Sequence, residues 1–390
     1  MKQYIGQWWT PSVPDEKLIG TLTLRGGDGP NLEIASDVAK KPEGSLAALI
    51  QPDMLISPSP ESIIVHGQAQ CGRLFTLYDG LVPNSDIGMG AVSTASLFFN
   101  HGFKGACIDN PVALPVERIY ARYPGMDAWL GARPFDIKHD FKAKRVSISH
   151  EIPTPESFRI DDQRKLILAW DRKGPVQALV QTRIGMRVLP WLGIEYATPV
   201  TQDRASDDAA VVGELLSMLL GAPTAIRQID MRSPEYTLEF KGELHLVGLR
   251  ALRPYFKLPQ SFRNWTAVDV LIPLSLVRSN FEALLQRWFE LRHDCWGVIV
   301  PYVARQRSPA PLAEGRFFDL ASVAESLHRH LRPAERRFPD SEAQAIRDKL
   351  LPSVPKKTPR LRSLCAFTYQ RLELQRTTRT TAAKVPYSCA

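Results

Sequence analysis

Several familiar signatures are absent from this sequence. The five cysteines are scattered, with no CxxC pair and no metal-ligand spacing. No Gly-rich loop ends in GK[ST] and no GxSxG occurs, so P-loop and α/β-hydrolase chemistry lack their motifs. No basic n-region leads into an apolar core, and no apolar run reaches the roughly 18 residues of a membrane span. We therefore expect a soluble, cytoplasmic protein with no metal, no cofactor and no membrane partner.

Acidic residues are scarce in one segment only. The chain carries a net charge of +8, and residues 353–390 hold eight basic residues against the single acid Glu373. That segment is therefore +7, which leaves +1 for residues 1–352. Because Lys and Arg that neutralise phosphates supply most non-specific affinity for nucleic acid, the tail could bind nucleic acid. The net charge of the remainder predicts no basic groove.

Short alternating runs fill the first 250 residues. "KLIGTLTL" and "NLEIA", and then "SIIVHGQA" and "RLFTLYDG", flank turn sequences and predict two hairpins. Partial alternation recurs in "KRVSISHEI", "KLILAW", "ALVQTRIGMRVL" and "YTLEFKGELHLVGL". Many strands with few helices between them predict an antiparallel, β-rich sandwich or barrel-like domain over residues 1–250.

One helix is expected inside this β-rich domain, over "SDDAAVVGELLSMLLG". Ser206 can act as its cap, Asp207 and Asp208 suit the positive N-terminal end, and Gly221 ends it. Its apolar stripe consists of Val211, Val212, Leu215, Leu216 and Leu219.

The hydrophobic period changes to 3.6 after about residue 260. "SNFEALLQRWFEL" and "RFFDLASVAESLHRHLRP" each place apolar residues on one stripe, and "DSEAQAIRDKLL" follows with Ser341 as a cap. These segments predict helices that pack on one another in a helical region over residues 260–352. The fold class is thus α+β, with a partial α-helical bundle after the β-rich domain.

Beyond Leu351 the periodicity fails. Residues 353–390 are rich in Pro, Thr and Arg and show no sustained apolar face. Two interpretations stay open: a disordered basic tail, or an out-of-frame segment left by a frameshift or truncation near residue 355.

Two local patterns allow both a functional and a structural interpretation. The adjacent Trp8 and Trp9 could stack on bases or sugars, but a tryptophan more often fills a core, where it buries on the order of 200 Å². Asp230 followed by Glu239 and Lys241 imitates a metal-dependent nuclease motif. Alternating Glu and Lys on the wet face of a strand gives the same string, and we favour that interpretation.

In order along the chain, several segments resemble the ApeA-type antiphage defence proteins, in which a β-rich ApeA N-terminal domain precedes a helical HEPN domain. "GQWWTPSVPDEKLIGTLTL" is similar to the family's opening Trp-x-Pro element and Gly-Thr-Leu strand. "IIVHGQAQCGRLFTLYDG" follows, and "FFNHGF" is similar to a Gly-x-His-Phe element around His101. The series continues through "IYARYPGMDAWLG", "ELLSMLLGAP", "LLQRWFEL" and "FFDLASVAESLHRHL" and spans roughly residues 1–350.

The resemblance implies a toxin-like ribonuclease set off by infection. HEPN ribonucleases use an Arg-x(4–6)-His motif on a distal helix, and an upstream Glu-x3-Lys/Arg element orients that pair. Glu325 and Arg329 match the upstream element, although an ordinary surface pair has the same spacing. No histidine follows His330, and the one match in the helical region, Arg287 to His293, lies on the wrong helix. We therefore expect an incomplete HEPN effector without ribonuclease activity.

Three hypotheses for function follow. The first is an ApeA-type defence protein whose N-terminal domain senses a phage-derived trigger, with RNA as the family's substrate and a homodimer through the helical region. The second is a non-catalytic module that binds a ligand or partner, with Trp8, Trp9 and His101 as the candidate binding residues. The third is a nucleic-acid binder that acts through the basic tail.

Overall fold

The computed structural model describes residues 1–25, 28–37, 45–46, 63–86, 92–132, 134–174, 186–253, 265–307, 313–332, 345 and 348–349. The chain divides into two units, Met1–Leu320 and Ala321–Ala390. Among the described residues, no helix combines the length and the apolar character that a membrane crossing requires.

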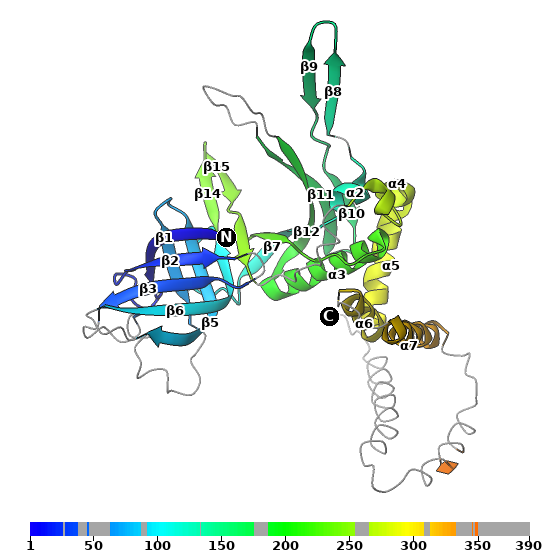
Figure 1. Ribbon diagram of the computed structural model, residues 1–390. Helices are drawn as coiled ribbons and strands as arrows, with labels where there is room; N and C mark the ends of the chain where they lie inside the picture. Colours follow the sequence, from blue (N-terminus) through cyan, green and yellow to red (C-terminus); the bar gives the residue numbers. More distant parts are fainter. Residues whose placement is uncertain are drawn as a thin grey trace, which may run out of the picture. The chain divides into compact units, whose positions relative to one another are not determined.

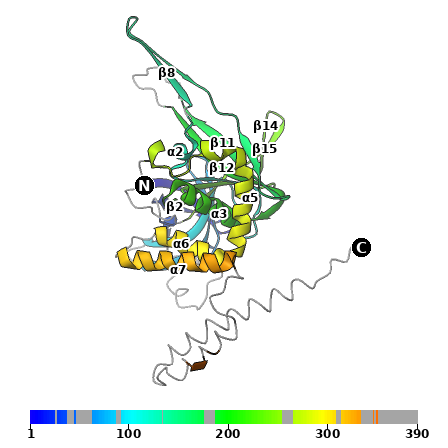
Figure 2. The same ribbon diagram turned by 90° about the vertical axis from the view of Figure 1, so that its right-hand side faces the viewer.

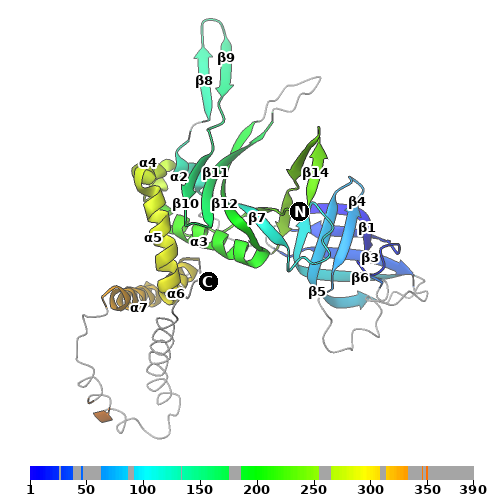
Figure 3. The same ribbon diagram turned by 180° about the vertical axis from the view of Figure 1, so that it is seen from behind.

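A closed six-stranded barrel forms the beginning of the chain (Figures 1 and 3). β1 pairs with β2 and β4, β3 pairs with β2 and β6, and β5 pairs with β4 and β6, all antiparallel, so the ring of strands closes. This confirms the predicted β-rich domain and both predicted hairpins. The strands are β1 (Lys2–Trp9), β2 (Leu18–Leu24), β3 (Asn31–Asp37), β4 (Val65–Ala69), β5 (Leu74–Asp86) and β6 (Val92–Lys104).

Trp8 occupies the interior of this barrel. Alternate residues of β1 point inward, and Trp8 is fully buried while its Nε1 donates a hydrogen bond to the Gly20 carbonyl at 3.2 Å. Gly67 lies directly opposite Trp8 on β4, and a Cβ atom there would sit 2.1 Å from the indole. The large ring therefore requires a residue without a side chain on the neighbouring strand. Other members of this core include Leu22, Leu32, Ile34, Val65, Phe75, Leu77, Leu97 and Phe99.

The C-terminal end of β6 still pairs with β5 of the barrel on one side and on its other side starts a second group of antiparallel strands. It pairs with β16, and the order continues β16-β13-β7-β12-β11-β10, so that twelve strands form one sheet. One long strand is thus shared by the barrel and the open part of the sheet. The added strands are β7 (Pro115–Arg122), β10 (Glu156–Arg159), β11 (Arg164–Lys173), β12 (Arg187–Thr201), β13 (Gln228–Arg232) and β16 (Leu249–Leu252).

Two further hairpins stand apart from this sheet as separate two-stranded pairs. They are β8 (Phe135–Asp140) with β9 (Arg145–His150), and β14 (Thr237–Phe240) with β15 (Glu243–Leu246). Nearly all of their residues are exposed. Lys241 and Gly242 form the second turn with φ of 55° and 81°, which splits the predicted run "YTLEFKGELHLVGL" into a hairpin and β16.

Helix α3 (Gln202–Leu220) packs on β7 and β12 and ends at Gly221, whose φ is 73°. The predicted stripe is buried apart from Val211, but the predicted start is wrong. The cap is Thr201, whose Oγ1 accepts from the Arg204 amide at 3.4 Å, because β12 runs directly into the helix. Ser206, the predicted cap, lies within the helix, about one turn after its first residue. Asp208, which we expected at the N-terminal end of the helix, is instead buried within it and pairs with Arg164 of β11 at 2.7 Å.

Besides α3, one short helix follows β7, and the other described helices follow the last strand of the sheet. They are α2 (Met126–Leu130), α4 (Leu274–Val277), α5 (Phe281–Asp294), α6 (Trp296–Arg307) and α7 (Ala313–Leu331), with 3-10 turns at Ala267–Asp269 and Arg278–Asn280. α5 lies beside α3, where the Trp288 Nε1 donates to the Val211 carbonyl at 3.0 Å (Figure 2). Sequence periodicity predicted α5 and α7 and missed α6.

The described residues of the helical region do not form a complete helical bundle. On α7 the predicted stripe residues Phe317, Leu320, Ala321 and Ala324 are exposed. The third predicted helix and the basic tail lie almost wholly outside the described residues. A bundle over residues 260–352 therefore stays a prediction.

Replacement of Gly67 by alanine tests the packing of Trp8. The new methyl group would collide with the indole, so we expect Gly67→Ala to lower the free energy of unfolding by about 1–3 kcal/mol. Gly297→Ala is the matched control, because a Cβ there meets no atom within 4 Å. Urea denaturation measures both, and equal stabilities of the two variants would contradict the close contact.

Candidate functional site

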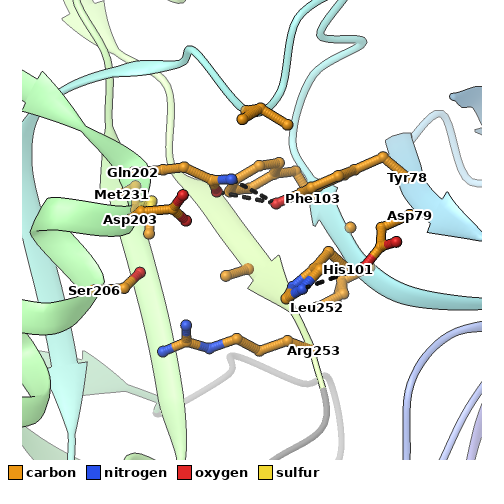
Figure 4. A pocket seen from close by; sticks show the side chains of 13 residues that line it. Tyr78, Asp79, His101, Phe103, Gln202, Asp203, Ser206, Met231, Leu252 and Arg253 are labelled. Atoms are coloured by element: carbon orange, nitrogen blue, oxygen red, sulfur yellow. Dashed lines mark hydrogen bonds and ion pairs between the residues drawn. The ribbon is translucent and has the colours of Figure 1, made fainter. Parts of the chain in front are cut away.

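A pocket of about 320 Å³ lies where the barrel, α3 and the open part of the sheet meet (Figure 4). Its volume falls in the range of small-ligand sites. The lining comes from β5 and β6 of the barrel, the first turns of α3, the strands β13 and β16, and two residues outside these elements, Val112 and Arg253. The residues are Tyr78, Asp79, His101, Gly102, Phe103, Val112, Gln202, Asp203, Ser206, Met231, Ala251, Leu252 and Arg253.

Tyr78 joins the barrel to α3 at this pocket. Its hydroxyl donates to Gln202 Oε1 at 3.0 Å, and Gln202 Nε2 lies 2.8 Å from the hydroxyl oxygen of Tyr78. Both side chains are buried, and burial raises the pKa of Tyr78 from 10 to about 12. The phenol therefore stays neutral and acts as a structural hydrogen-bond partner.

His101 forms the exposed wall beside Tyr78. The two residues lie opposite each other on β6 and β5, and their rings stack at 5.4 Å. The Asp79 carboxylate lies 3.8 Å from His101 Nε2 and accepts from Asn100 Nδ2 at 3.1 Å. Asp79 has a φ of 55°, a left-handed conformation that aspartate tolerates better than most residues. Since 43% of the His101 side chain is accessible, the imidazole can contact a ligand.

The opposite wall carries groups of both signs. Figure 4 shows Asp203 and Ser206 of α3 and Arg253, which follows β16, around the hollow that His101 also lines. Between them lies an apolar floor that includes Phe103 and Met231. A guanidinium, an imidazole, two carboxylates and a hydroxyl around apolar surface can orient a polar ligand of mixed charge.

A second, more open hollow lies over β10, β11 and the start of α5. Its main feature is Arg164, which pairs with Asp161 at 2.6 Å and with the buried Asp208 at 2.7 Å. Tyr196 donates to Asp208 at 3.2 Å, and burial together with that carboxylate raises the pKa of Tyr196. These groups pair their charges and hydrogen bonds with one another, so the hollow is a structural junction of β11, β12 and α3.

The structure separates the two tryptophans. Trp8 is a core residue that solvent does not reach, which excludes it as a ligand contact. Trp9 is half-buried, with its ring edge against His66 at 6.2 Å and the Lys17 amine 4.8 Å from its centre. Of the three candidate binding residues, His101 alone lines the pocket.

The candidate catalytic residues do not form a site in the described part of the chain. Arg287 and His293 are both exposed on α5, and six residues of helix place them about 120° apart. Arg287 pairs with Glu290 at 2.9 Å. Glu325 and Arg329 form an exposed ion pair at 2.5 Å on α7, as ordinary helix-surface neighbours do.

Asp230, Glu239 and Lys241 do not converge either. Asp230 makes two hydrogen bonds with Arg250, at 2.7 and 2.9 Å. Glu239 and Lys241 belong to the exposed β14–β15 hairpin.

Sequence reasoning missed most of the pocket. Tyr78 and Gln202 are 124 residues apart, and neither stands in a motif that predicts their contact. The available signal was "LYDG", where Asp-Gly marks an unusual backbone after an alternating run. Arg253 and Asp203 carried no signal of their own.

The barrel, the helix-backed sheet and the pocket between them define a β-rich domain with a preformed ligand-sized site. A family model described as ApeA N-terminal domain 1 matches residues 3–288, which is most of the chain and ends within α5. The chain therefore belongs to this family, and membership suggests a role in antiphage defence. No curated protein and no solved structure matches the chain.

The pH dependence of stability tests the burial of Tyr78. Above pH 10 the unfolded chain releases the phenolic proton that the folded protein retains, so stability decreases as pH rises from 10 to 12. This group accounts for about 2 kcal/mol of that loss. Tyr78→Phe should cost about 1 kcal/mol at neutral pH and show a shallower alkaline decline in urea denaturation. Parallel declines in both proteins would contradict the shifted pKa.

Proposed function

We propose that this chain is the recognition part of an antiphage defence protein and that its pocket binds a phage-derived trigger. Family membership supports the defence role. The observation that supports recognition is the pocket itself, which has an exposed imidazole, a guanidinium and an apolar floor, and whose described residues form no catalytic arrangement.

The location of the pocket also supports signalling. A ligand there would touch the barrel through His101, α3 through Asp203, and the end of β16 through Arg253. α3 in turn contacts α5, where Arg292 pairs with the buried Glu214 at 2.5 Å. A ligand that favours one arrangement of α3 would therefore bias the helices that follow the sheet.

We further propose that the helical region, residues 260–352, is a HEPN-type effector that is incomplete in these 390 residues, in a cytoplasmic protein. The support is the sequence: no Arg-x(4–6)-His motif follows Glu325 and Arg329. RNA remains the substrate expected of a complete effector. In this chain the binding function is then separate from catalysis.

Thermal unfolding tests whether the pocket recognises a trigger. Because a ligand that binds the folded state stabilises it, extract of phage-infected cells should raise the melting temperature of the dye-labelled chain, and extract of uninfected cells should not. His101→Ala and Arg253→Ala should each abolish the shift.

Arg145→Ala is the control for that experiment. It removes an exposed arginine from the β8–β9 hairpin, outside the pocket, and should retain the shift. A shift that persists in both pocket variants would refute recognition at this site.

RNA cleavage tests the incomplete effector. The purified chain should leave transfer RNA and total RNA intact, because Arg287 and His293 point in different directions. Gel analysis of RNA incubated with the chain measures this. Cleavage that disappears in Arg287→Ala or His293→Ala would show that the pair is catalytic after all.

A further inference from the structure

The open part of the sheet has two different faces. Ile119 and Ala121 of β7 and Tyr123, just after the strand, are buried, and the Tyr123 hydroxyl donates to the Ala209 carbonyl of α3 at 2.6 Å. These alternate residues therefore face the helix. Arg118, Tyr120 and Arg122 of the same strand face away from α3 and are half-exposed.

Cations gather on this outer face and continue to one end of the barrel. Lys104 of β6 lies directly opposite Arg250 of β16, and the chain places Arg73 and Lys2 nearby. Further along, Arg122 lies near Arg250 and Arg227. We call this set the cation row: Lys2, Arg73, Lys104, Arg250, Arg122 and Arg227.

Carboxylates only partly balance the cation row. Asp230 is held by Arg250, and Asp127 and Asp171 lie near Arg122. Six cations against these three carboxylates leave a net charge of +3. Among the described residues, no carboxylate lies within ion-pair distance of the Lys104 amine. Residues 1–352 carry a net charge of only +1, so it is the fold that brings these cations together on one surface.

The arrangement costs stability in the free protein. Like charges directly opposite each other on neighbouring strands repel, as Lys104 and Arg250 do. Burial lowers the pKa of Lys104, and Arg73, Arg250 and Lys2 lower it further, while the Asp230 carboxylate opposes the shift only in part. A repulsive contact in an accessible position indicates a missing anionic partner more readily than a structural role.

Aromatic rings lie between the cations. Arg73 and Lys104 stand 5.9 and 5.8 Å from the ring of Tyr4 at the end of the barrel. Tyr120 lies over Gly193, where a Cβ would come within 2.6 Å of its ring. Cations along a track with interspersed rings are how proteins hold a single strand of nucleic acid without reading its sequence.

We propose that the cation row binds the phosphate backbone of single-stranded nucleic acid, at a surface separate from the pocket and from the basic tail. The row runs from Lys104 of β6 to Arg250 of β16 and on to Arg122 of β7, and Arg227 lies just before β13, so it offers an extended polyanion several cations along its length. Arginine, which holds phosphate by two parallel hydrogen bonds, supplies four of its six charges. The half-exposed rings of Tyr4 and Tyr120 would contact bases.

Charge reversal on the full-length chain tests this proposal. Fluorescence anisotropy with labelled oligothymidine should show binding that weakens with salt. Arg73→Glu with Arg227→Glu should weaken it about tenfold and reduce the salt dependence. Both residues are exposed, so the variant should fold. Lys142→Glu with Arg145→Glu, at the β8–β9 hairpin, changes net charge equally and should leave affinity nearly unchanged.

A second variant separates this function from a structural role. Lys104→Gln should weaken oligothymidine binding and, because repulsion is relieved, raise the urea midpoint of the free protein; a lower midpoint would assign Lys104 to the fold. Equal weakening by both double variants would assign oligothymidine binding to net charge or to the basic tail, and would contradict the proposal. Absence of oligothymidine binding at low salt would also contradict it. Displacement of the oligonucleotide by polyglutamate at equal charge would identify an acidic polypeptide as the partner instead.

Discussion

The indole of Trp8 inside the barrel is the contact on which the rest of the structure depends. Its ring takes the space that Gly67 leaves on the neighbouring strand, and its Nε1 satisfies the Gly20 carbonyl. A barrel of only six strands has a small interior, so one large side chain decides whether the strands can close around it. Once closed, the barrel holds β5 and β6 in register, and that register places Tyr78 opposite His101 in the pocket wall.

Strand β6 connects the barrel to the open part of the sheet. Its first half pairs with β3, and its last residues pair with β16 of the open sheet. His101 and Lys104 lie within a few residues of each other on this strand, one in the pocket and one in the cation row. A single strand therefore contributes to two separate surfaces.

The two surfaces suit different partners. The pocket combines cationic, anionic and apolar groups in a small volume, which favours a compact ligand held in one orientation. The cation row is long, open and mainly of one sign, which favours an extended polyanion and little sequence selectivity. In a defence protein these properties fit a specific signal at one surface and a general nucleic-acid contact at the other.

Sequence by itself determined the local structure of this protein. Period-2 runs located most strands, period 3.6 located α5 and α7, and Gly221 marked the end of α3, because backbone preference and one-sided burial act over a few neighbouring residues. The order of weak motifs also identified the family, with "FFNHGF" pointing to His101. Tertiary structure alone decided the cap of α3, the separation of Trp8 from Trp9, the pocket and the cation row. These depend on contacts between residues far apart in the chain, such as Tyr78 with Gln202, and neither composition nor net charge records which side chains a fold brings together.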